Sequence, residues 1–114
     1  THPHPRCYGT FPRKIKKFVL DEELMSLEQA IGSMTSLPAK KFKLKGRGEI
    51  AEGNFADIAV IDLEKITDRA TYRDPHQYAL GVDFLLVNGE ISIAEGKATG
   101  HRKGRALKMS EKSL

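Results

Sequence analysis

Apolar residues in the first part of the chain recur with the period of an α-helix. One apolar stripe has members at i, i+4, i+7 and i+8, namely Phe11, Ile15, Phe18 and Val19, and lysines occupy the opposite face. This spacing predicts a helix from about Pro12 to Leu20. The acidic run 21–23 is unfavourable at the negative end of a helix dipole, so we expect the helix to end there.

Two further helices are predicted before residue 45. Ser26 and Gln29 have the spacing of a capping box, and the apolar residues that follow keep the helical period. Ser36 or Leu37 is expected to cap a third, short helix. Pro38 would lie in its first turn, where the missing N–H costs nothing.

The second half of the chain has short apolar runs between glycines, which predict strands. The run 58–61 is apolar throughout and lies between two aspartates, which is typical of a strand covered on both faces. The runs 84–87 and 91–94 flank Asn88-Gly89, a dipeptide typical of a tight hairpin turn. We therefore predict three or four strands.

These elements predict an α+β fold, with two or three short helices followed by a small, mostly antiparallel sheet. They divide the chain into a helical part (1–45), a strand-rich part (46–100) and a basic tail (101–114). The connection over residues 63–81 is longer than most loops of compact domains. A chain of 114 residues has few elements to cover both faces of a sheet, and open sheet edges favour pairing. We therefore expect part of a larger fold or an obligate oligomer, and self-association of the isolated chain.

The chain has a net charge of +4, and its charged residues are distributed unevenly along the sequence. Residues 1–47 carry ten Lys and Arg against four Asp and Glu, residues 48–100 four against ten, and residues 101–114 five against one. The cations of 40–47 and 102–105 could form a phosphate-binding surface or a solvated face. No zinc finger or aromatic RNA-binding signature is present, so we expect no nucleic-acid partner. A basic module that binds nucleic acid or an acidic protein is the alternative function.

The sequence also indicates where in the cell the protein is located. No apolar run approaches a membrane span and no secretory signal is recognisable, so we expect a cytoplasmic protein with no membrane partner, trimmed at its N-terminus. The single cysteine, Cys7, cannot form an internal disulfide and lacks partners for a structural zinc site.

The opening run 4–13 holds the strongest candidate for chemistry. Its two prolines and one glycine predict a rigid, extended loop. Arg6 lies in this run, and a guanidinium on a stiff backbone is suited to bind a carboxylate with two parallel hydrogen bonds. A structural ion pair between Arg6 and an acidic neighbour such as Asp21 is the alternative.

A series of short motifs follows this run along the chain. They are Ser26–Ala30, Met34–Ala39, Gly48–Ile50 with Gly53, Ala56–Asp62, Asp74–Ala79 and Val87–Gly89. Together with the opening run, this ordered set resembles the C-terminal part of the N-acyl-D-amino-acid deacylases (D-aminoacylases), zinc-dependent members of the amidohydrolase superfamily. The middle motifs are typical of amidohydrolases generally, whereas the opening run and Asp74–Ala79 narrow the resemblance to the deacylases.

The resemblance implies a fragment of a larger hydrolase. The segments would be the last loop and helices of a (β/α)8 barrel and the C-terminal strands of a composite β-sandwich. The parent enzyme, with the rest of the deacylase chain, would hydrolyse the amide of an N-acyl-D-amino acid with zinc as cofactor. The metal ligands and the catalytic aspartate would lie upstream of Thr1, so no catalytic residue and no metal ligand is expected here, and this chain alone would be inactive. Arg6 matches the family arginine expected to bind the substrate carboxylate.

Other candidate residues are expected to be structural. His2 and His4 imitate the His-x-His pair of amidohydrolase barrels, but that pair belongs to the first barrel strand, so we expect loop histidines. Surface or turn-capping roles are expected for His76 and His101. Packing roles are expected for two half-buried tyrosines, Tyr72 and Tyr78. A fragment of another amidohydrolase, such as a dihydroorotase or a hydantoinase-like enzyme, is a further alternative.

Overall fold

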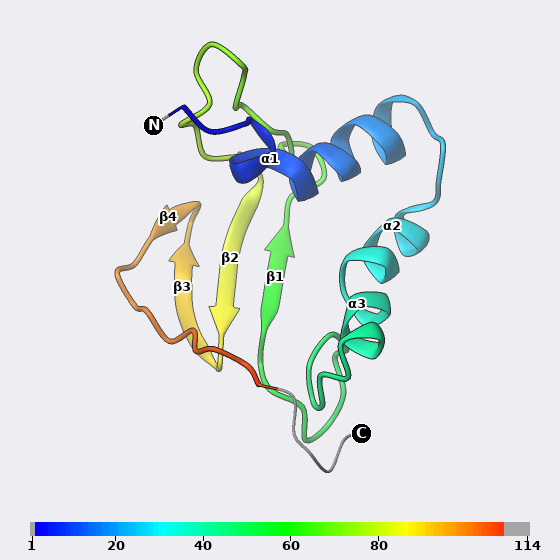
Figure 1. Cartoon of the computed structure of the whole chain (residues 1–114), viewed down its shortest axis with the longest axis vertical. Helices are drawn as coiled ribbons and strands as arrows, with labels where there is room; N and C mark the ends of the chain where they lie inside the picture. Colours follow the sequence, from blue (N-terminus) through cyan, green and yellow to red (C-terminus); the bar gives the residue numbers. More distant parts are fainter. Residues whose placement is uncertain (1, 109–114) are drawn as a thin grey trace.

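Residues 2–108 are described in the computed structural model. The helical elements are α1 (Arg6–Arg13), η1 (Lys14–Asp21), α2 (Leu27–Met34) and α3 (Ser36–Lys41). The strands are β1 (Ile58–Ile61), β2 (Val82–Val87), β3 (Glu90–Ala94) and β4 (Lys97–Ala98). In Figure 1 the helices descend one side of the molecule, the strands lie on the other, and α1 crosses near the end of the sheet where β1 ends and β2 begins.

The first helix begins at Arg6 and not at Pro12, so the prediction of an extended loop over 4–13 is wrong. Pro5 is the N-cap residue with φ −52°, close to the helical value, and Pro12 lies inside α1. Proline removes a hydrogen bond, but its fixed φ also favours a helix start. After Arg13 the helix continues as η1, a π-helical stretch that ends at Asp21, as the acidic run predicted.

The two short helices follow their predicted caps. The Ser26 hydroxyl accepts a hydrogen bond from the Gln29 N–H at 3.1 Å, and the Gln29 side chain accepts one from the Ser26 N–H at 3.0 Å. The capping box of α2 is therefore confirmed. The cap of α3 is Thr35, one residue before the predicted position, and Pro38 lies in its first turn.

The strands form an antiparallel sheet in the order β1-β2-β3-β4. Asn88 and Gly89 connect β2 and β3 with φ values of 50° and 81°, so the predicted hairpin is confirmed. Within the described residues β1 pairs with β2 alone, and Ala59 and Val60 are exposed. The prediction that 58–61 is covered on both faces is therefore wrong for this chain by itself.

The long connection between β1 and β2 is irregular but packed. Ile66 is 1% exposed, and Thr67 and Leu80 form an isolated antiparallel bridge. Gly81 has φ +96°, and a Cβ there would lie 2.3 Å from Ile66 Cα. Only glycine fits this close approach at a positive φ, so Gly81 fixes the return of the chain into β2.

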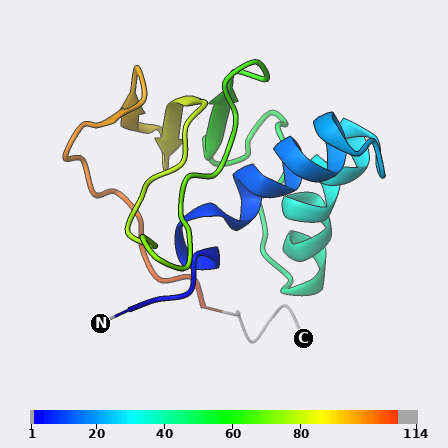
Figure 2. The same cartoon turned by 90° about the horizontal axis from the view of Figure 1, so that it is seen from above.

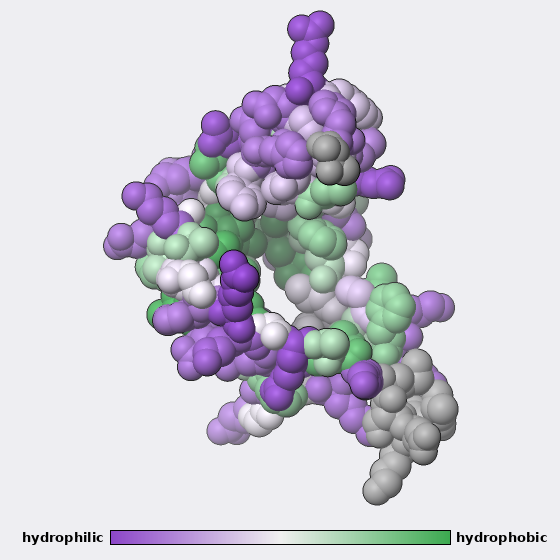
Figure 3. Space-filling model, turned by 60° about the vertical axis from the view of Figure 1, so that its left-hand side comes forward, coloured by the Kyte–Doolittle hydropathy of each residue, from purple (hydrophilic) through white to green (hydrophobic). Residues whose placement is uncertain are grey.

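The apolar core is thin. Its buried apolar side chains are Ile15, Ala30, Ala39, Ile66 and Ala70, while Phe11, Leu24, Phe42, Val60 and several others are exposed. The accessible surface is 8834 Å², whereas a compact protein of 12.7 kDa exposes roughly 6,200 Å². Figure 3 shows hydrophobic residues gathered around a hollow in one face. The chain thus leaves much apolar surface in contact with solvent. None of the helices in residues 2–108 has the length and apolar composition needed to cross a bilayer.

Candidate functional site

Helix α1 places Arg6 at its first turn. The Arg6 N–H donates a hydrogen bond to His4 Nδ1 at 3.0 Å, and the Thr10 hydroxyl donates one to the Arg6 carbonyl at 2.7 Å. The first contact satisfies an N–H that a helix N-terminus otherwise leaves open, and the second adds a bond to the Arg6 carbonyl, so both hold the backbone of Arg6. The side chain of Arg6 is exposed.

A cavity of about 660 Å³ lies beside this turn. Its lining combines charged side chains, among them Arg6, Arg13, Lys14 and Asp68, with apolar surface from residues such as Phe18 and Ala70. Such a mixture suits a small ligand with one charged end and one apolar end. The Arg6 guanidinium lines this cavity rather than pairing with Asp21, whose carboxylate accepts a hydrogen bond from Lys16 at 2.7 Å.

The other charges in the cavity have partners. Arg13 Nη1 lies 3.5 Å from Asp68 Oδ2, and Lys14 Nζ donates to the Ser33 hydroxyl at 2.6 Å. Within residues 2–108 the Arg6 guanidinium forms no hydrogen bond and no salt bridge. Arg6 is therefore a cation of this cavity whose side chain has no partner within residues 2–108.

The long connection lies against the start of α1, as Figure 2 shows. A Cβ on Gly9 would lie 2.7 Å from Asp68 Cβ, so the absence of a side chain allows this approach. Two histidines of the opening segment form hydrogen bonds with Tyr72. His2 Nε2 lies 2.6 Å from the Tyr72 carbonyl oxygen, and His4 Nε2 lies 3.1 Å from the Tyr72 hydroxyl. The position of Arg6 thus depends on residues about 65 positions away.

Two ring contacts extend this arrangement to the Asp74–Ala79 segment. The Tyr8 hydroxyl lies 3.1 Å from His76 Nδ1, and the Tyr8 ring centroid lies 5.6 Å from that of Tyr78. Tyr72 and Tyr78 are 72% and 81% exposed. The prediction of half-buried tyrosines is therefore wrong, because the connection lies on the surface of this chain.

A second cluster, at the other end of the sheet, joins two of the short motifs to the residue that precedes a third. Arg47 forms a salt bridge with Asp57, and its Nη2 donates to Asn88 Oδ1 at 2.7 Å. Asp57 Oδ1 accepts a hydrogen bond from the Asn88 N–H at 2.8 Å, and the Arg47 guanidinium lies 4.1 Å from the centroid of the Phe55 ring. The Arg47 side chain is 10% exposed. We call Arg47, Asp57 and Asn88 the Arg47 cluster.

The Arg47 cluster changes the acidity of its carboxylate. Burial by itself would raise the pKa of Asp57, but the Asn88 N–H and the Arg47 guanidinium stabilise the charged form more strongly. The net effect lowers the pKa of Asp57 below its usual 3.8. This group is therefore charged in the native protein at neutral pH, and its role is to hold the hairpin turn against the preceding loop.

The histidines lie apart from any metal site. His101 Nδ1 lies 3.2 Å from the Ile91 carbonyl at the surface, as expected of a turn-associated histidine. Across residues 2–108 no group of three or more His, Cys, Asp or Glu side chains could hold a metal ion. The side chains present in this part of the chain do not fit a zinc site, so we attribute no metal-dependent step to them.

Comparison with known protein families identifies the family of this chain. A family model described as the amidohydrolase family matches residues 1–93, so the chain belongs to the amidohydrolase family. It is similar to the N-acyl-D-glutamate deacylase of Alcaligenes xylosoxydans xylosoxydans, with 41% identity over 107 residues that cover 94% of this chain and 22% of the relative.

Two solved structures support the same relationship. One is a D-aminoacylase mutant in complex with copper chloride, with a TM-score of 0.90 and 39% identity over 95% of this chain and 23% of that chain. The other is N-acyl-D-glutamate deacylase from Bordetella bronchiseptica, complexed with zinc and a phosphonate mimic of the tetrahedral intermediate. Its TM-score is 0.78, with 39% identity over 85% of this chain and 21% of that chain. This chain spans about a fifth of these relatives, and the predicted resemblance is confirmed.

No local sequence pattern identifies Asp68 or Arg47 as important. Asp68 forms a salt bridge with Arg13 and packs against Gly9. It lies in a connection without periodicity, so no local pattern links it to α1. Arg47 was treated as one cation in a basic run, although its burial separates it from the neighbouring lysines.

Proposed function

We propose that this chain is the part of an N-acyl-D-amino-acid deacylase that binds the carboxylate of the substrate, through Arg6. The observation that carries the proposal is the Arg6 guanidinium, which lines a cavity and has no partner within residues 2–108. The relatives that match nearly the whole of this chain are named as deacylases of N-acyl-D-amino acids, which supports that substrate class.

Arg6 would orient the substrate. A guanidinium donates two parallel hydrogen bonds to a carboxylate and so fixes both the position and the plane of that group. Holding the carboxylate supplies one of the contacts that a site needs to position the amide and to distinguish D from L substrates. This geometry gives Arg6 a binding role, and we assign no proton transfer and no metal ligation to any residue of this chain.

The proposed reaction is amide hydrolysis. Water adds its oxygen to the acyl carbon, the C–N bond breaks, and the leaving nitrogen takes a proton, which gives a carboxylic acid and a D-amino acid. We propose zinc as the metal of the complete hydrolase because the Bordetella bronchiseptica relative is described with zinc. Its ligands would come from polypeptide other than residues 2–108.

The proposal assigns the exposed apolar surface to contacts with that other polypeptide. Residues 1–45 would belong to the barrel, 46–100 to the sandwich, and 101–114 to a tail. Without those contacts the open edge of β1 and residues such as Val60 favour self-association. Light scattering over a concentration series tests this, and a monomer throughout would contradict it. The exposed free thiol of Cys7 fits a reducing compartment, and we propose the cytoplasm.

A chimera tests the reaction class. This chain would replace the matched 107 residues of the Alcaligenes xylosoxydans xylosoxydans deacylase. We expect the chimera to release D-amino acids from N-acyl-D-glutamate and related N-acyl-D-amino acids, and to leave the L-isomers and dihydroorotate unchanged. Hydrolysis of dihydroorotate in preference to N-acyl-D-amino acids would instead support the dihydroorotase alternative.

A further inference from the structure

Two basic segments that are far apart in the sequence meet at the end of the sheet opposite α1. Residues 43–47 follow α3, and residues 105–108 belong to the stretch after β4, yet both line one cavity of about 310 Å³. We call this cavity the basic pocket. Its cationic lining consists of Lys43, Lys45, Arg47, Arg105 and Lys108.

The charge of the basic pocket is largely uncompensated. Arg47 has the carboxylate of Asp57 as partner. Among the described residues, the other four cations form no salt bridge, and no acidic side chain lines the pocket. Because no carboxylate lines this space, an anion in it would be attracted to the lining cations and would lower the free energy of the native state.

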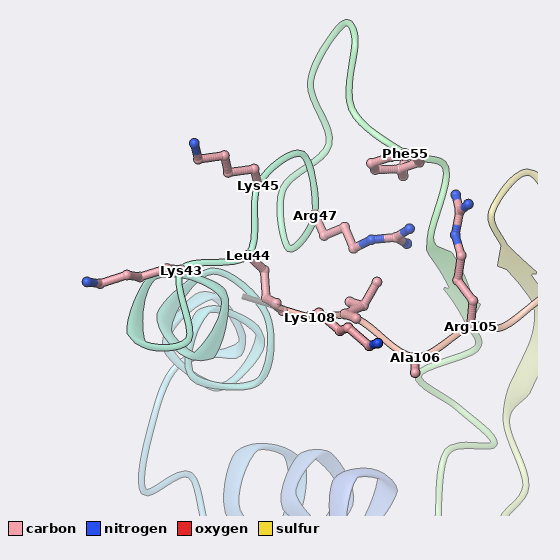
Figure 4. Close-up of a pocket in the computed structure, with 9 residues that line it drawn as sticks. Lys43, Leu44, Lys45, Arg47, Phe55, Arg105, Ala106 and Lys108 are labelled. Carbon is pink, nitrogen blue, oxygen red and sulfur yellow. The ribbon is translucent and has the colours of Figure 1, made fainter. Parts of the chain in front are cut away.

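Phe55 organises the two guanidinium groups. The Arg47 and Arg105 guanidinium carbons lie 4.1 and 5.6 Å from the centroid of its ring. In Figure 4 both guanidinium groups extend toward Phe55, whereas the amines of Lys43 and Lys45 extend outward. The Arg47 guanidinium is already bonded to Asp57 and Asn88. Stacking on the same ring holds the Arg105 guanidinium in place while its N–H groups remain available at the edge.

We propose that the basic pocket binds a small phosphate-bearing anion with at least two negative charges, of the polyphosphate or phosphate-ester class. The oxygens of a phosphate point in several directions, so Arg105 and Lys108 can each contact one. A carboxylate presents only two oxygens in one plane. Arginine forks and lysine point charges are both common phosphate ligands.

The size of the site favours a small molecule over a nucleic acid. A volume of about 310 Å³ is in the range of ligand pockets, and the cations belong to two short segments around one pocket rather than to a long stripe. The proposal is independent of the deacylase function. Arg6 belongs to α1, whereas the segments 43–47 and 105–108 that line the basic pocket lie near the opposite end of the sheet (Figure 1).

Calorimetric titration of the 114-residue chain with inorganic pyrophosphate tests the proposal. We expect binding at about 50 mM NaCl that weakens strongly at about 300 mM, since screening acts on exposed charges. Arg105→Gln and Lys108→Gln should each weaken binding by about fivefold or more, because each removes a charged contact. Arg102→Gln is the matched control, since this arginine lies in the same stretch but does not line the pocket, and it should stay within twofold of the parent, roughly.

Three results would overturn the proposal. The first is no heat of pyrophosphate binding at the lower salt concentration. The second is an equal loss in Arg105→Gln, Lys108→Gln and the Arg102→Gln control, which would indicate diffuse attraction only. The third is tighter binding of a single-stranded oligonucleotide than of pyrophosphate, with the Arg102→Gln control also weakened, which would instead favour a nucleic-acid surface. Circular dichroism of each variant checks that its fold is unchanged.

Discussion

The two arginines that matter most in this chain differ in what surrounds them. Arg6 is exposed at the first turn of α1 and has no partner within residues 2–108, although it lines a cavity. Arg47 is 10% exposed and is fully occupied by Asp57, Asn88 and the Phe55 ring. The same side chain therefore serves recognition in one place and architecture in the other.

This difference between Arg6 and Arg47 indicates that the motifs of this family have separate physical roles. The Gly48–Ile50, Ala56–Asp62 and Val87–Gly89 motifs meet at or beside the Arg47 cluster, so their residues are explained by the packing of the sheet. The opening run and the Asp74–Ala79 motif meet beside Arg6 through the Tyr8 and His76 side chains. The opening run therefore lines the cavity of the proposed carboxylate site, and the Asp74–Ala79 motif contacts that run from outside the cavity.

The largest effect is expected from Arg6→Lys in the chimera with the Alcaligenes xylosoxydans xylosoxydans deacylase. Lysine keeps the charge but loses the two parallel hydrogen bonds, so kcat/KM for N-acyl-D-glutamate should fall about 100-fold, or about 2.7 kcal/mol. Arg73→Lys is the control, since Arg73 is exposed and does not line the cavity. Near-normal turnover by the Arg6→Lys chimera would contradict the proposal that Arg6 binds the substrate carboxylate.

Arg47→Ala should act on stability instead. It leaves the Asp57 carboxylate and the Asn88 side chain without their partner, and we expect a loss of about 2 kcal/mol in the free energy of unfolding. Urea denaturation followed by circular dichroism measures this. Arg6→Ala should change the same quantity by less than about 0.5 kcal/mol, since a surface residue without partners is removed. Equal losses in both variants would break the distinction between the two arginines.

Gly9→Ala tests whether the packing of α1 positions Arg6. The added methyl group would overlap Asp68 Cβ, which lies 2.7 Å from the ideal Cβ position. Overpacking costs about 1–3 kcal/mol, and the better helix propensity of alanine offsets up to about 1 kcal/mol of that loss. We expect a net loss of about 1 kcal/mol in urea denaturation, with reduced turnover by the chimera. Unchanged turnover would show that Arg6 tolerates a shift of α1.

The smallest effect concerns pH. The pKa of Asp57 is lower in the folded chain than its usual 3.8, so its contribution to stability is complete above that value and is lost as pH falls through the folded pKa. The free energy of unfolding should therefore fall less steeply with acid in Asp57→Asn than in the parent chain below about pH 4. Identical slopes would argue against a charged Asp57 in the Arg47 cluster.

Local signals predicted much of the fold. The capping box of Ser26 and Gln29 and the Asn88-Gly89 hairpin are confirmed, because each depends on residues close in sequence. Pro5 and Pro12 were misinterpreted, because a fixed φ near −60° is compatible with both a loop and a helix. The contact of Gly9 with Asp68, and the joining of 43–47 with 105–108, depend on packing between distant segments. No local pattern in the sequence contains that information.

The central claim is that Arg6 binds the carboxylate of the substrate, and a paired comparison tests it most directly. We would measure kcat/KM of the parent and Arg6→Ala chimeras on an N-acyl-D-amino acid and on the analogue whose α-carboxylate is replaced by a carboxamide. The parent chimera should strongly prefer the carboxylate, and the variant should lose most of that preference while its activity on the carboxamide changes little. The same preference in both proteins would contradict the claim, since the carboxylate would then be recognised by groups other than Arg6.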